Sequence, residues 1–509
     1  MACTTILVGK KASYDGSTII ARNDDSGSGH YMPKKFVVVE PEEQLKTYRS
    51  VLAHLEIPLP EEAMRYTSMP NAVDGEGIWA ASGVNAAHVA MTATETITSN
   101  PRVLGADPLV EYQPAENGTE EIPGGIGEED IVCLVLPYIR SARAGVERLG
   151  NLLETYGTYE MNGIAFQDQD EIWWMETIGG HHWIAKKVPD DVYVVMPNQF
   201  GTDVFDMKDA LTDQNAHMCS KDLAEFIAKN HLDLTIRRSA ERKAEDADLP
   251  FGRFINPREI FGSHDDSDHV YNTPRAWFME RYLNPKTYRW DGENADYTPV
   301  SDDIPWSLIP ENKVTMEDVK YVLSSHYQGT PYDPYLPYGD KKMAGAYRSI
   351  GVNRTDFMSA IQMRPYGAED NRVIEWVAFA SNAFNVMVPF YANVDTTPEY
   401  LANTTADVST DNFYWSSRMI AAMADASYSK SLFHIERYQE TMLAKGHEVI
   451  NRYDEQIEKE PDAGKRSALR EQANQEMADI LRKETGNTLS KVLYELSNQM
   501  KNSYARSDA

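Results

Sequence analysis

Alternating apolar and polar positions predict that the first part of the chain consists mainly of β-strands. Residues 4–8 are apolar or β-branched, residues 14–17 carry turn chemistry, and residues 18–21 resume an extended pattern, which together predict a hairpin. Further strands are predicted at residues 36–39, 78–82 and 89–94. Short apolar segments separated by turns predict an antiparallel meander at residues 163–166, 172–176, 182–185 and 192–195.

Helical spacing dominates two other regions. Apolar residues recur every three or four positions in residues 128–158, which predicts two helices there, and a strongly charged helix is predicted at residues 219–245. From residue 412 to residue 505 the pattern is again helical, and the turn at residues 461–464 predicts a helical hairpin packed on the body of the protein or on another subunit. Between these regions we expect a long ordered loop at residues 326–339 and two strands within residues 373–395.

The order of these segments predicts the fold class. Strands are followed by helices and then by strands again, which favours an α+β fold with packed layers over alternating βαβ units. The chain of 509 residues is longer than one ordinary domain.

The charge balance excludes two classes of partner. The chain has 78 acidic and 49 basic residues and a formal net charge of −29, so neither nucleic acid nor an anionic membrane surface is an expected partner. No apolar run is long enough for a transmembrane helix. The apolar residues 4–8 precede Lys10 and Lys11, the reverse of a signal peptide, so we expect a cytoplasmic location. Three cysteines are too few and too scattered for a disulfide framework.

Cys3 offers the most reactive combination of groups. If residues 1 and 2 are removed, Cys3 carries a thiol and a free α-amino group whose pKa of about 7.7–8.0 lets it act as a general base. Arg22 would lower the pKa of the thiol, and Asp25 would hold the amine by a hydrogen bond. Each residue alone has a simpler interpretation: Cys3 as packing in an apolar strand, and Asp24 with Asp25 as a solvated turn.

No metal or cofactor is predicted. The sequence contains no His-Glu-x-x-His, paired Cys-x-x-Cys, phosphate-binding Gly-rich loop or Gly-x-Ser-x-Gly motif. His181 and His182 are adjacent, and because neighbouring side chains of a strand point to opposite faces, we do not expect both to bind one metal ion.

Several separated motifs resemble one known family. The opening Met-Ala-Cys-Thr-Thr-Ile-Leu-Val-Gly-Lys-Lys-Ala, the motif at residues 14–18, Met-Thr-Ala-Thr-Glu-Thr at 91–96 and Glu-Thr-Ile-Gly-Gly-His-His-Trp at 176–183 are similar to the C69 dipeptidases. The resemblance covers at least residues 3–280. It places the chain among N-terminal-nucleophile (Ntn) hydrolases, which also resemble bile-salt and penicillin V amidases.

The resemblance implies a role for particular residues. Cys3 matches the nucleophile, and Arg22 with Asp25 matches the Arg-x-x-Asp pair that positions thiol and amine. Asn198 matches the asparagine of the oxyanion hole, and Arg275 matches an arginine near the nucleophile. Without the resemblance, Asn198 is better interpreted as a turn residue after Pro197, and Arg275 is equally interpreted as a surface arginine stacked near Trp277.

Two expectations concern substrate binding. Thr94 falls where the related amidases place a second oxyanion donor, and since it is not asparagine, a backbone N–H near Thr94 would have to serve. Glu95 is a candidate for binding the free ammonium group of a substrate, or else faces solvent beyond a strand end.

The resemblance also implies fold and activity. We expect a four-layer αββα Ntn-hydrolase sandwich at residues 3–400, with insertions at about 219–260 and 301–345, and a helical region at 401–509. The implied function is hydrolysis of dipeptides with broad side-chain tolerance through a thioester at Cys3. The alternatives are an amidase acting on a non-peptide acyl substrate and a non-catalytic protein resembling the secernins. The helical tail is compatible with a homo-oligomer.

One feature departs from a simple N-terminal nucleophile. Ala2 stands between Met1 and Cys3, so removal of the methionine alone leaves Ala-Cys. A free amine on Cys3 requires one further cleavage. If Ala2 stays, the nitrogen of Cys3 is part of an amide and is no base.

Overall fold

The computed structural model describes residues 3–116, 118–236 and 249–502, and the side chains of residues 93–95 also fall outside the description. The described chain forms two units. The first comprises Met1–Ile20, Val39–Ser68 and Asp74–Val314, and the second comprises Ala21–Val38, Met69–Val73 and Thr315–Ala509. Strand β2 (Thr18–Asp25) begins in the first unit and ends in the second. The domain boundary at residue 400 stays a prediction.

The first unit contains a six-stranded antiparallel sheet in the order β14-β11-β10-β9-β8-β7. Its strands are β7 (Ser82–Val84), β8 (Ala90–Thr96), β9 (Asn162–Gln167), β10 (Ile172–Ile178), β11 (His182–Lys187) and β14 (His217–Cys219). Helices α2 (Glu128–Val135) and α3 (Ala142–Tyr156) contact this sheet. Their apolar positions share a buried core with Trp173 and Met175 of β10, because alternate residues of a strand face the same side.

Strand β12 (Tyr193–Met196) corrects the predicted meander. The segments that became β9, β10 and β11 pair in sequence as expected, but β12 pairs with β1 (Thr4–Val8) in a different sheet, with Thr5 opposite Met196. On its other edge β12 pairs with β16 (Ser307–Leu308). The sequence pattern shows that a segment is extended, whereas its partner is chosen by contacts between distant residues.

The end of β1 is tightly packed. Gly9 follows the strand and donates its N–H to the carbonyl oxygen of Val192 at 2.9 Å. A Cβ atom at this position would collide with the carbonyl oxygens of Pro189 and Asp190, so only glycine fits. Strand β1 is therefore held closely against the chain that leads into β12.

Shorter elements complete the first unit. They are η1 (Pro41–Glu43), β4 (Thr47–Arg49), β5 (Glu56–Pro58), β6 (Tyr66–Ser68), α1 (Pro101–Ala106), η2 (Leu136–Tyr138), β13 (Phe205–Asp206), α4 (Met207–Leu211), α5 (Leu223–Lys229), β15 (Phe254–Ile255), α6 (Pro257–Phe261), α7 (Asp268–Tyr271) and α8 (Thr273–Leu283). Strand β3 (Val37–Val39) lies at the boundary between the two units.

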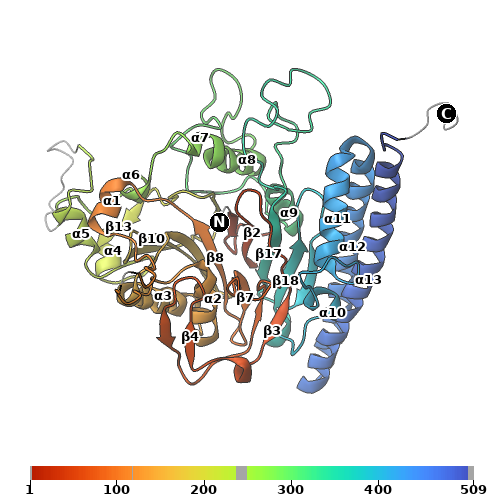
Figure 1. Ribbon diagram of the computed structural model, residues 1–509, viewed down its shortest axis with the longest axis horizontal. Helices are drawn as coiled ribbons and strands as arrows, with labels where there is room; N and C mark the ends of the chain where they lie inside the picture. The colour runs from red at the N-terminus through yellow and green to blue at the C-terminus, as the bar shows by residue number, and fades with distance from the viewer. Residues whose placement is uncertain (1–2, 117, 237–248, 503–509) are drawn as a thin grey trace. The chain divides into compact units, whose positions relative to one another are not determined.

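The second unit packs helices on three antiparallel strands. Strands β17 (Thr355–Met363), β18 (Val373–Phe379) and β19 (Val388–Tyr391) pair in that order. The predicted helical hairpin is present as α12 (Tyr428–Lys459) and α13 (Ala463–Ser497), beside α11 (Phe413–Ala426) (Figure 1). Both long helices contact β19, so the hairpin packs on the body of the chain. The unit also contains α9 (Met316–Leu323), η5 (Glu369–Asn371) and α10 (Glu399–Ala402).

Two predicted elements differ in extent from the observed ones. The strand predicted at residues 78–82 begins only at Ser82, because Trp79 (φ 49°) and Ala81 (φ 53°) adopt the left-handed backbone that interrupts an extended chain. The helix predicted at residues 219–245 is present only as α5, which ends before His231 (φ 51°). Residues 237–248 of that prediction lie outside the described residues.

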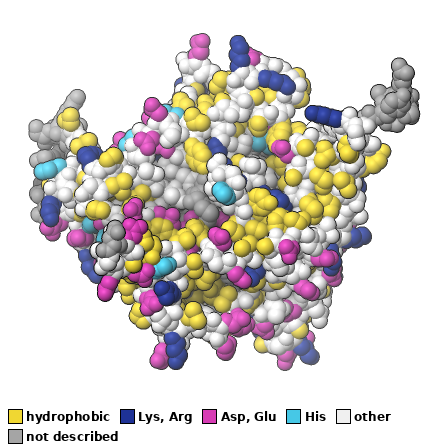
Figure 2. Space-filling model, viewed as in Figure 1, with side chains coloured by type: hydrophobic (Ala, Val, Ile, Leu, Met, Phe, Trp, Pro, Cys, Tyr) yellow, Lys and Arg dark blue, Asp and Glu magenta, His cyan; other side chains and the backbone are white. Residues whose placement is uncertain are grey.

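The chain is therefore a mixed α/β protein with antiparallel sheets and a C-terminal helical region, as predicted at that level. Within the described residues, no helix is both long and apolar enough to span a membrane. Acidic side chains are distributed over the face drawn in Figure 2, with Lys and Arg side chains between them, in keeping with the negative net charge.

Candidate active site

Cys3 directly precedes β1 and is buried in the first unit. The antiparallel register places Thr5 opposite Met196, so Asn198, two residues beyond Met196, extends the neighbouring strand toward the level of Cys3. The pairing of β1 with β12 thus brings together two predicted site residues that are far apart in the sequence.

Arg275 connects these two residues. It lies in the first turn of α8 and is fully buried. Its Nη1 donates to the carbonyl oxygen of Cys3 and, at 2.7 Å, to Oγ1 of Thr4, while its Nη2 donates to Oδ1 of Asn198 at 2.8 Å. Because Oδ1 of Asn198 is the acceptor, the Nδ2 group is the donor end of that amide. The arginine therefore fixes which way the amide of Asn198 is oriented.

Asn272 is a site residue that the sequence did not single out. Its Oδ1 accepts from Nη2 of Arg275 at 2.6 Å and from the backbone N–H of Asn198 at 3.1 Å. Its Nδ2 donates to the carbonyl oxygen of Asn198 at 3.1 Å and to Oδ1 of Asp268 at 2.5 Å. One side chain thus holds both backbone groups of Asn198 and supports Arg275.

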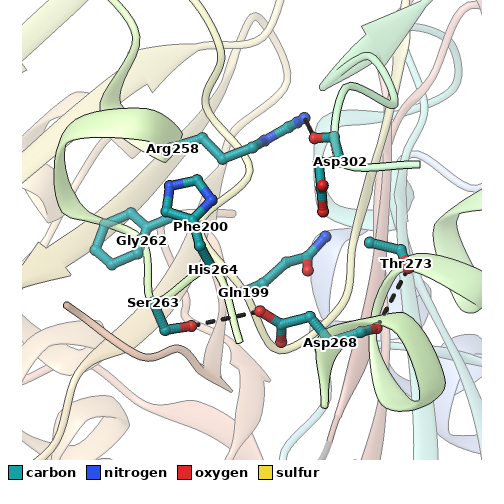
Figure 3. A pocket seen from close by; sticks show the side chains of 9 residues that line it. All are labelled: Gln199, Phe200, Arg258, Gly262, Ser263, His264, Asp268, Thr273 and Asp302. Carbon is teal, nitrogen blue, oxygen red and sulfur yellow. Dashed lines mark hydrogen bonds between the residues drawn. The ribbon is translucent and has the colours of Figure 1, made fainter. Parts of the chain in front are cut away.

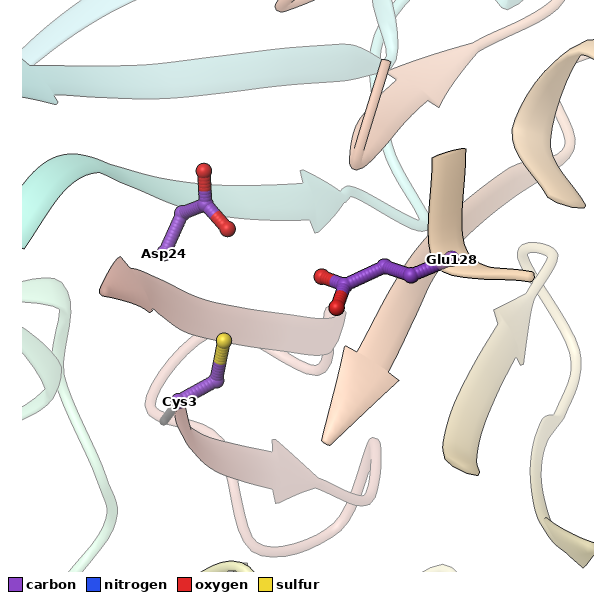
Figure 4. A group of neighbouring side chains, drawn as sticks. All are labelled: Cys3, Asp24 and Glu128. Carbon is purple, nitrogen blue, oxygen red and sulfur yellow. The ribbon is translucent and has the colours of Figure 1, made fainter. Parts of the chain in front are cut away.

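Glu128 is a second residue that was not predicted. It begins α2, is buried, and its carboxylate points toward the thiol of Cys3 (Figure 4), with an oxygen within 4.8 Å of the sulfur. The backbone N–H of Glu128 donates to Glu160 Oε1 at 2.7 Å. Burial and the charge of Glu128 raise the pKa of Glu160 to about 6. Asp24, also drawn in Figure 4, belongs to the second unit.

A pocket of about 630 Å³ borders Asn198. Its lining residues include Thr96, Asp265, Asp268 and Tyr271. The volume lies within the range of small-molecule sites. Asp268 also lines a cavity of about 20 Å³ (Figure 3), which has room for about one water molecule.

The predicted residues Arg22 and Asp25 lie in the second unit, at the end of β2. Arg22 is paired with Asp24 at 2.9 Å, and the buried Lys34 contacts the same carboxylate at 3.1 Å. Burial alone would raise the pKa of Asp24, but the neighbouring Lys34 and Arg22 lower it. Asp25 accepts a hydrogen bond from Thr355 Oγ1 at 2.5 Å and forms an ion pair with Arg348.

Four other positions of interest lie wholly or partly outside the described residues. The side chains of Thr94 and Glu95 fall outside the described residues, as do Met1 and Ala2. The pairing of β8 with β9 shifts register between Ala93 and Glu95.

His181 and His182 form a hydrogen-bonded cluster around one carboxylate. Nδ1 of His181 lies 2.9 Å from Oδ1 of Asp107, and Nδ1 of His182 lies 2.7 Å from Oδ2. Burial opposes ionisation of Asp107, but the hydrogen bonds of the two histidines bring its pKa down to about 2. The pair is thus organised around Asp107, at the turn before β11.

Comparison with known proteins places the chain in a family. The model of peptidase family C69 matches residues 2–441. The chain belongs to peptidase family C69. It is 54% identical to the dipeptidase of Bifidobacterium longum, over the full length of both proteins. It is 49% identical to the probable dipeptidase A of Streptococcus pyogenes serotype M3, again over both full lengths. It is 40% identical to dipeptidase A of Lactobacillus helveticus, over 97% of this chain and 96% of that protein.

The three thiols of this C69 peptidase have different surroundings. Burial raises the pKa of both Cys133 and Cys219 to about 12, which disfavours the nucleophilic thiolate. Cys133 accepts a hydrogen bond from Tyr66, and Cys219 packs in an apolar cluster. Cys3 instead lies beside Arg275 and Glu128.

Proposed function

We propose that this C69 peptidase hydrolyses dipeptides with Cys3 as the nucleophile. The observation that carries the proposal is the contact made by Arg275, which binds the backbone of Cys3 and the side chain of Asn198 with one guanidinium group. An acyl-transfer site needs a nucleophile and an oxyanion donor in fixed relative positions. The buried arginine supports that relation.

The proposed reaction has two steps. The Cys3 thiolate attacks the peptide carbonyl carbon, the C–N bond breaks, and the proton taken from the thiol passes to the leaving amine. Water then attacks the thioester, releases the first amino acid as a carboxylic acid, and returns the proton to the sulfur. Nδ2 of Asn198 and a backbone N–H near Thr94 stabilise the oxyanion in both steps. The register shift beside Thr94 supports the second donor, because the extra residue of a bulge is not paired in the ladder.

The proton carrier in this proposal is the α-amine of Cys3. It requires removal of Met1 and Ala2, and an amine with a pKa of about 7.7–8.0 is partly neutral near pH 7. The roles of Arg22 in lowering the thiol pKa and of Asp25 in holding the amine stay predictions. Asp25 would hold the amine in addition to contacting Thr355 and Arg348.

The substrate class is inferred from the relatives and the pocket. The relatives from Bifidobacterium longum and Lactobacillus helveticus are named dipeptidases. The pocket beside Asn198 holds apolar and polar residues, Val270 and Tyr271 together with Asp265 and Asp268, which favours tolerance for different side chains. The αββα Ntn sandwich, the cytoplasmic location and a homo-oligomeric state belong to the same proposal.

The proposal is tested by removing the thiol. We expect Cys3→Ala to lower kcat on alanyl-alanine by at least about 1,000-fold, because no other group forms the acyl bond. The matched control is Cys219→Ala, which removes a buried thiol outside the site and should keep kcat within about threefold. Intact mass and N-terminal sequencing of both proteins establish whether each chain begins at residue 3.

Four results would contradict parts of the proposal. Full activity of Cys3→Ala would reject the nucleophile. An active wild-type chain that begins at Ala2 would reject the α-amine as the base. Thiol-dependent hydrolysis of acyl amides but not of dipeptides would favour the amidase, and a wild-type chain that cleaves neither would favour the secernin-like protein.

A further inference from the structure

We propose that Glu128 binds the free α-ammonium group of the substrate and thereby restricts hydrolysis to peptides with an unblocked N-terminus. This inference rests on the proposed function, because it assumes that Cys3 attacks the carbonyl carbon of the first amino acid. The sequence suggested Glu95 for binding this ammonium group, and we assign that role to Glu128.

The position of the carboxylate relative to the thiol is the first observation. A carboxylate oxygen of Glu128 lies within 4.8 Å of the sulfur of Cys3, and both residues belong to the first unit. Figure 4 shows the side chain of Glu128 extending from the start of α2 with its carboxylate directed toward the thiol. Both side chains are buried, so a cation bound there would be held in a medium where charge attraction is strong.

The geometry of a dipeptide limits how far from the sulfur an ammonium-binding group can lie. The α-nitrogen and the scissile carbonyl carbon share one Cα atom and are therefore about 2.5 Å apart. A nucleophile in an attack position lies about 3–3.5 Å from that carbon. An ammonium–carboxylate hydrogen bond adds about 2.8 Å. An anchor for the α-ammonium must consequently lie within about 8–9 Å of the sulfur, and the carboxylate of Glu128, within 4.8 Å, satisfies this limit.

The surrounding charge also favours a bound cation. The backbone N–H of Glu128 donates to Glu160, so two carboxyl groups lie close together near Cys3. Their mutual repulsion contributes to the raised pKa of Glu160. A substrate ammonium beside Glu128 would relieve this repulsion.

Access to the site follows from the processing that the mechanism needs. Met1 and Ala2 are bonded directly to the nitrogen of Cys3, so their removal takes two residues away from the immediate neighbourhood of the thiol. Processing also creates a second cation, the α-ammonium of Cys3. The test must therefore distinguish binding of the substrate's ammonium from binding of the protein's own.

Equilibrium binding separates these roles. In the Cys3→Ala background, which cannot turn over, we expect Glu128→Gln to weaken binding of alanyl-alanine by about 10- to 100-fold, the value of a lost hydrogen bond to a charged group. Binding of propionyl-alanine, which lacks the ammonium, should change by less than about threefold. Equal weakening of both ligands, or no change in either, would overturn the proposal.

Kinetics on the thiol-containing chain give the second measurement. Glu128→Gln should raise KM for alanyl-alanine and reduce the preference over propionyl-alanine, whereas an anchor for the Cys3 amine would lower kcat for both substrates. The control is Glu129→Gln, since Glu129 is buried in the same turn but accepts from Ser50 and Leu52. Glu95→Gln is measured in parallel, and loss of the preference in that variant alone would also overturn the assignment to Glu128.

These measurements keep the two proposals apart. Activity of Cys3→Ala would reject the proposed nucleophile, whereas the ligand preference in binding would still report on Glu128. Mass analysis shows whether each variant begins at residue 3. Glu128→Asp, which keeps the charge, should restore part of the preference if the carboxylate itself is the anchor.

Discussion

The buried cations beside Cys3 and those beside Asp24 have different partners. In the first unit, Arg275 donates to carbonyl, hydroxyl and amide oxygens around Cys3. In the second unit, Arg22 and Lys34 contact the carboxylate of Asp24, and Arg348 contacts Asp25. The first arrangement orients neutral dipoles beside the proposed nucleophile, and the second neutralises the charges of Asp24 and Asp25.

This difference indicates what each network contributes. A guanidinium bound to neutral oxygens keeps its positive charge and fixes their direction, which suits a site where negative charge develops during a reaction. A buried ion pair compensates desolvation, and removing one partner leaves an unbalanced charge. Loss of the Asp24 carboxylate should therefore affect mainly folding, and changes around Arg275 should affect mainly turnover.

The largest expected effect is on stability in the second unit. Asp24→Asn leaves Arg22 and Lys34 buried without their shared carboxylate and should lower the free energy of unfolding by about 3–5 kcal/mol. Urea denaturation followed by circular dichroism measures this change. The matched control is Asp411→Asn, which breaks an exposed pair with Arg482 (76% and 58% side-chain exposure) and should cost at most about 1 kcal/mol. Equal losses in both variants would show that the buried pairs of Asp24 contribute no more to stability than an exposed pair.

The next effect is on catalysis in the first unit. Asn198→Asp preserves the acceptor for Arg275 but replaces the donor with a negative charge, so kcat should fall by about 100- to 1,000-fold, equivalent to ~2.7–4 kcal/mol. The thermal unfolding temperature should change little, because the new carboxylate can pair with Arg275. A large loss of stability with a proportionate loss of active protein would instead assign Asn198 a structural role.

The smallest effect concerns the pH dependence of stability near Cys3. The pKa of Glu160 is raised from 4.5 to about 6, so between these values the folded chain holds a proton that the unfolded chain releases. Stability should therefore fall as pH rises through this window. Glu160→Gln should remove that part of the slope in urea titrations at about pH 4.5 and about pH 6.5. If stability depends on pH identically in the wild type and in Glu160→Gln, the charge near Glu128 is compensated by a group other than the proton on Glu160.

The sequence pattern predicted elements whose periodicity is local. Strands β9, β10 and β11 and the α12–α13 hairpin have the expected type and order, because turn residues separate clear apolar runs. The predicted partner of β12 was wrong, since strand pairing depends on residues far along the chain. Helix α8 was not predicted, although Pro274 in its first turn is a helix start signal. Strand β17 was not predicted because its polar residues are buried together with its apolar ones along the whole strand.

The candidate site shows the same division. Cys3 was identified first from its thiol and its place near the start of the sequence, and Asn198 and Arg275 came from a family resemblance; the structure places the three in one network. Asn272 was missed because its function is to hold other residues. Glu128 was missed because an acidic first turn is usually solvated, whereas here Glu128, Glu129 and Asp130 are 1%, 0% and 1% exposed.

Strand β1 is anchored at both ends, by Arg275 on the carbonyl of Cys3 and by Gly9 against Pro189 and Asp190. The five residues Thr4–Val8 therefore act as a spacer of fixed length. Inserting or deleting one residue would shift the strand by about 3.3 Å and turn every later side chain to the opposite face. The residue count of this buried segment is therefore fixed, so homologues and engineered variants should carry length changes in loops and not between Cys3 and Gly9.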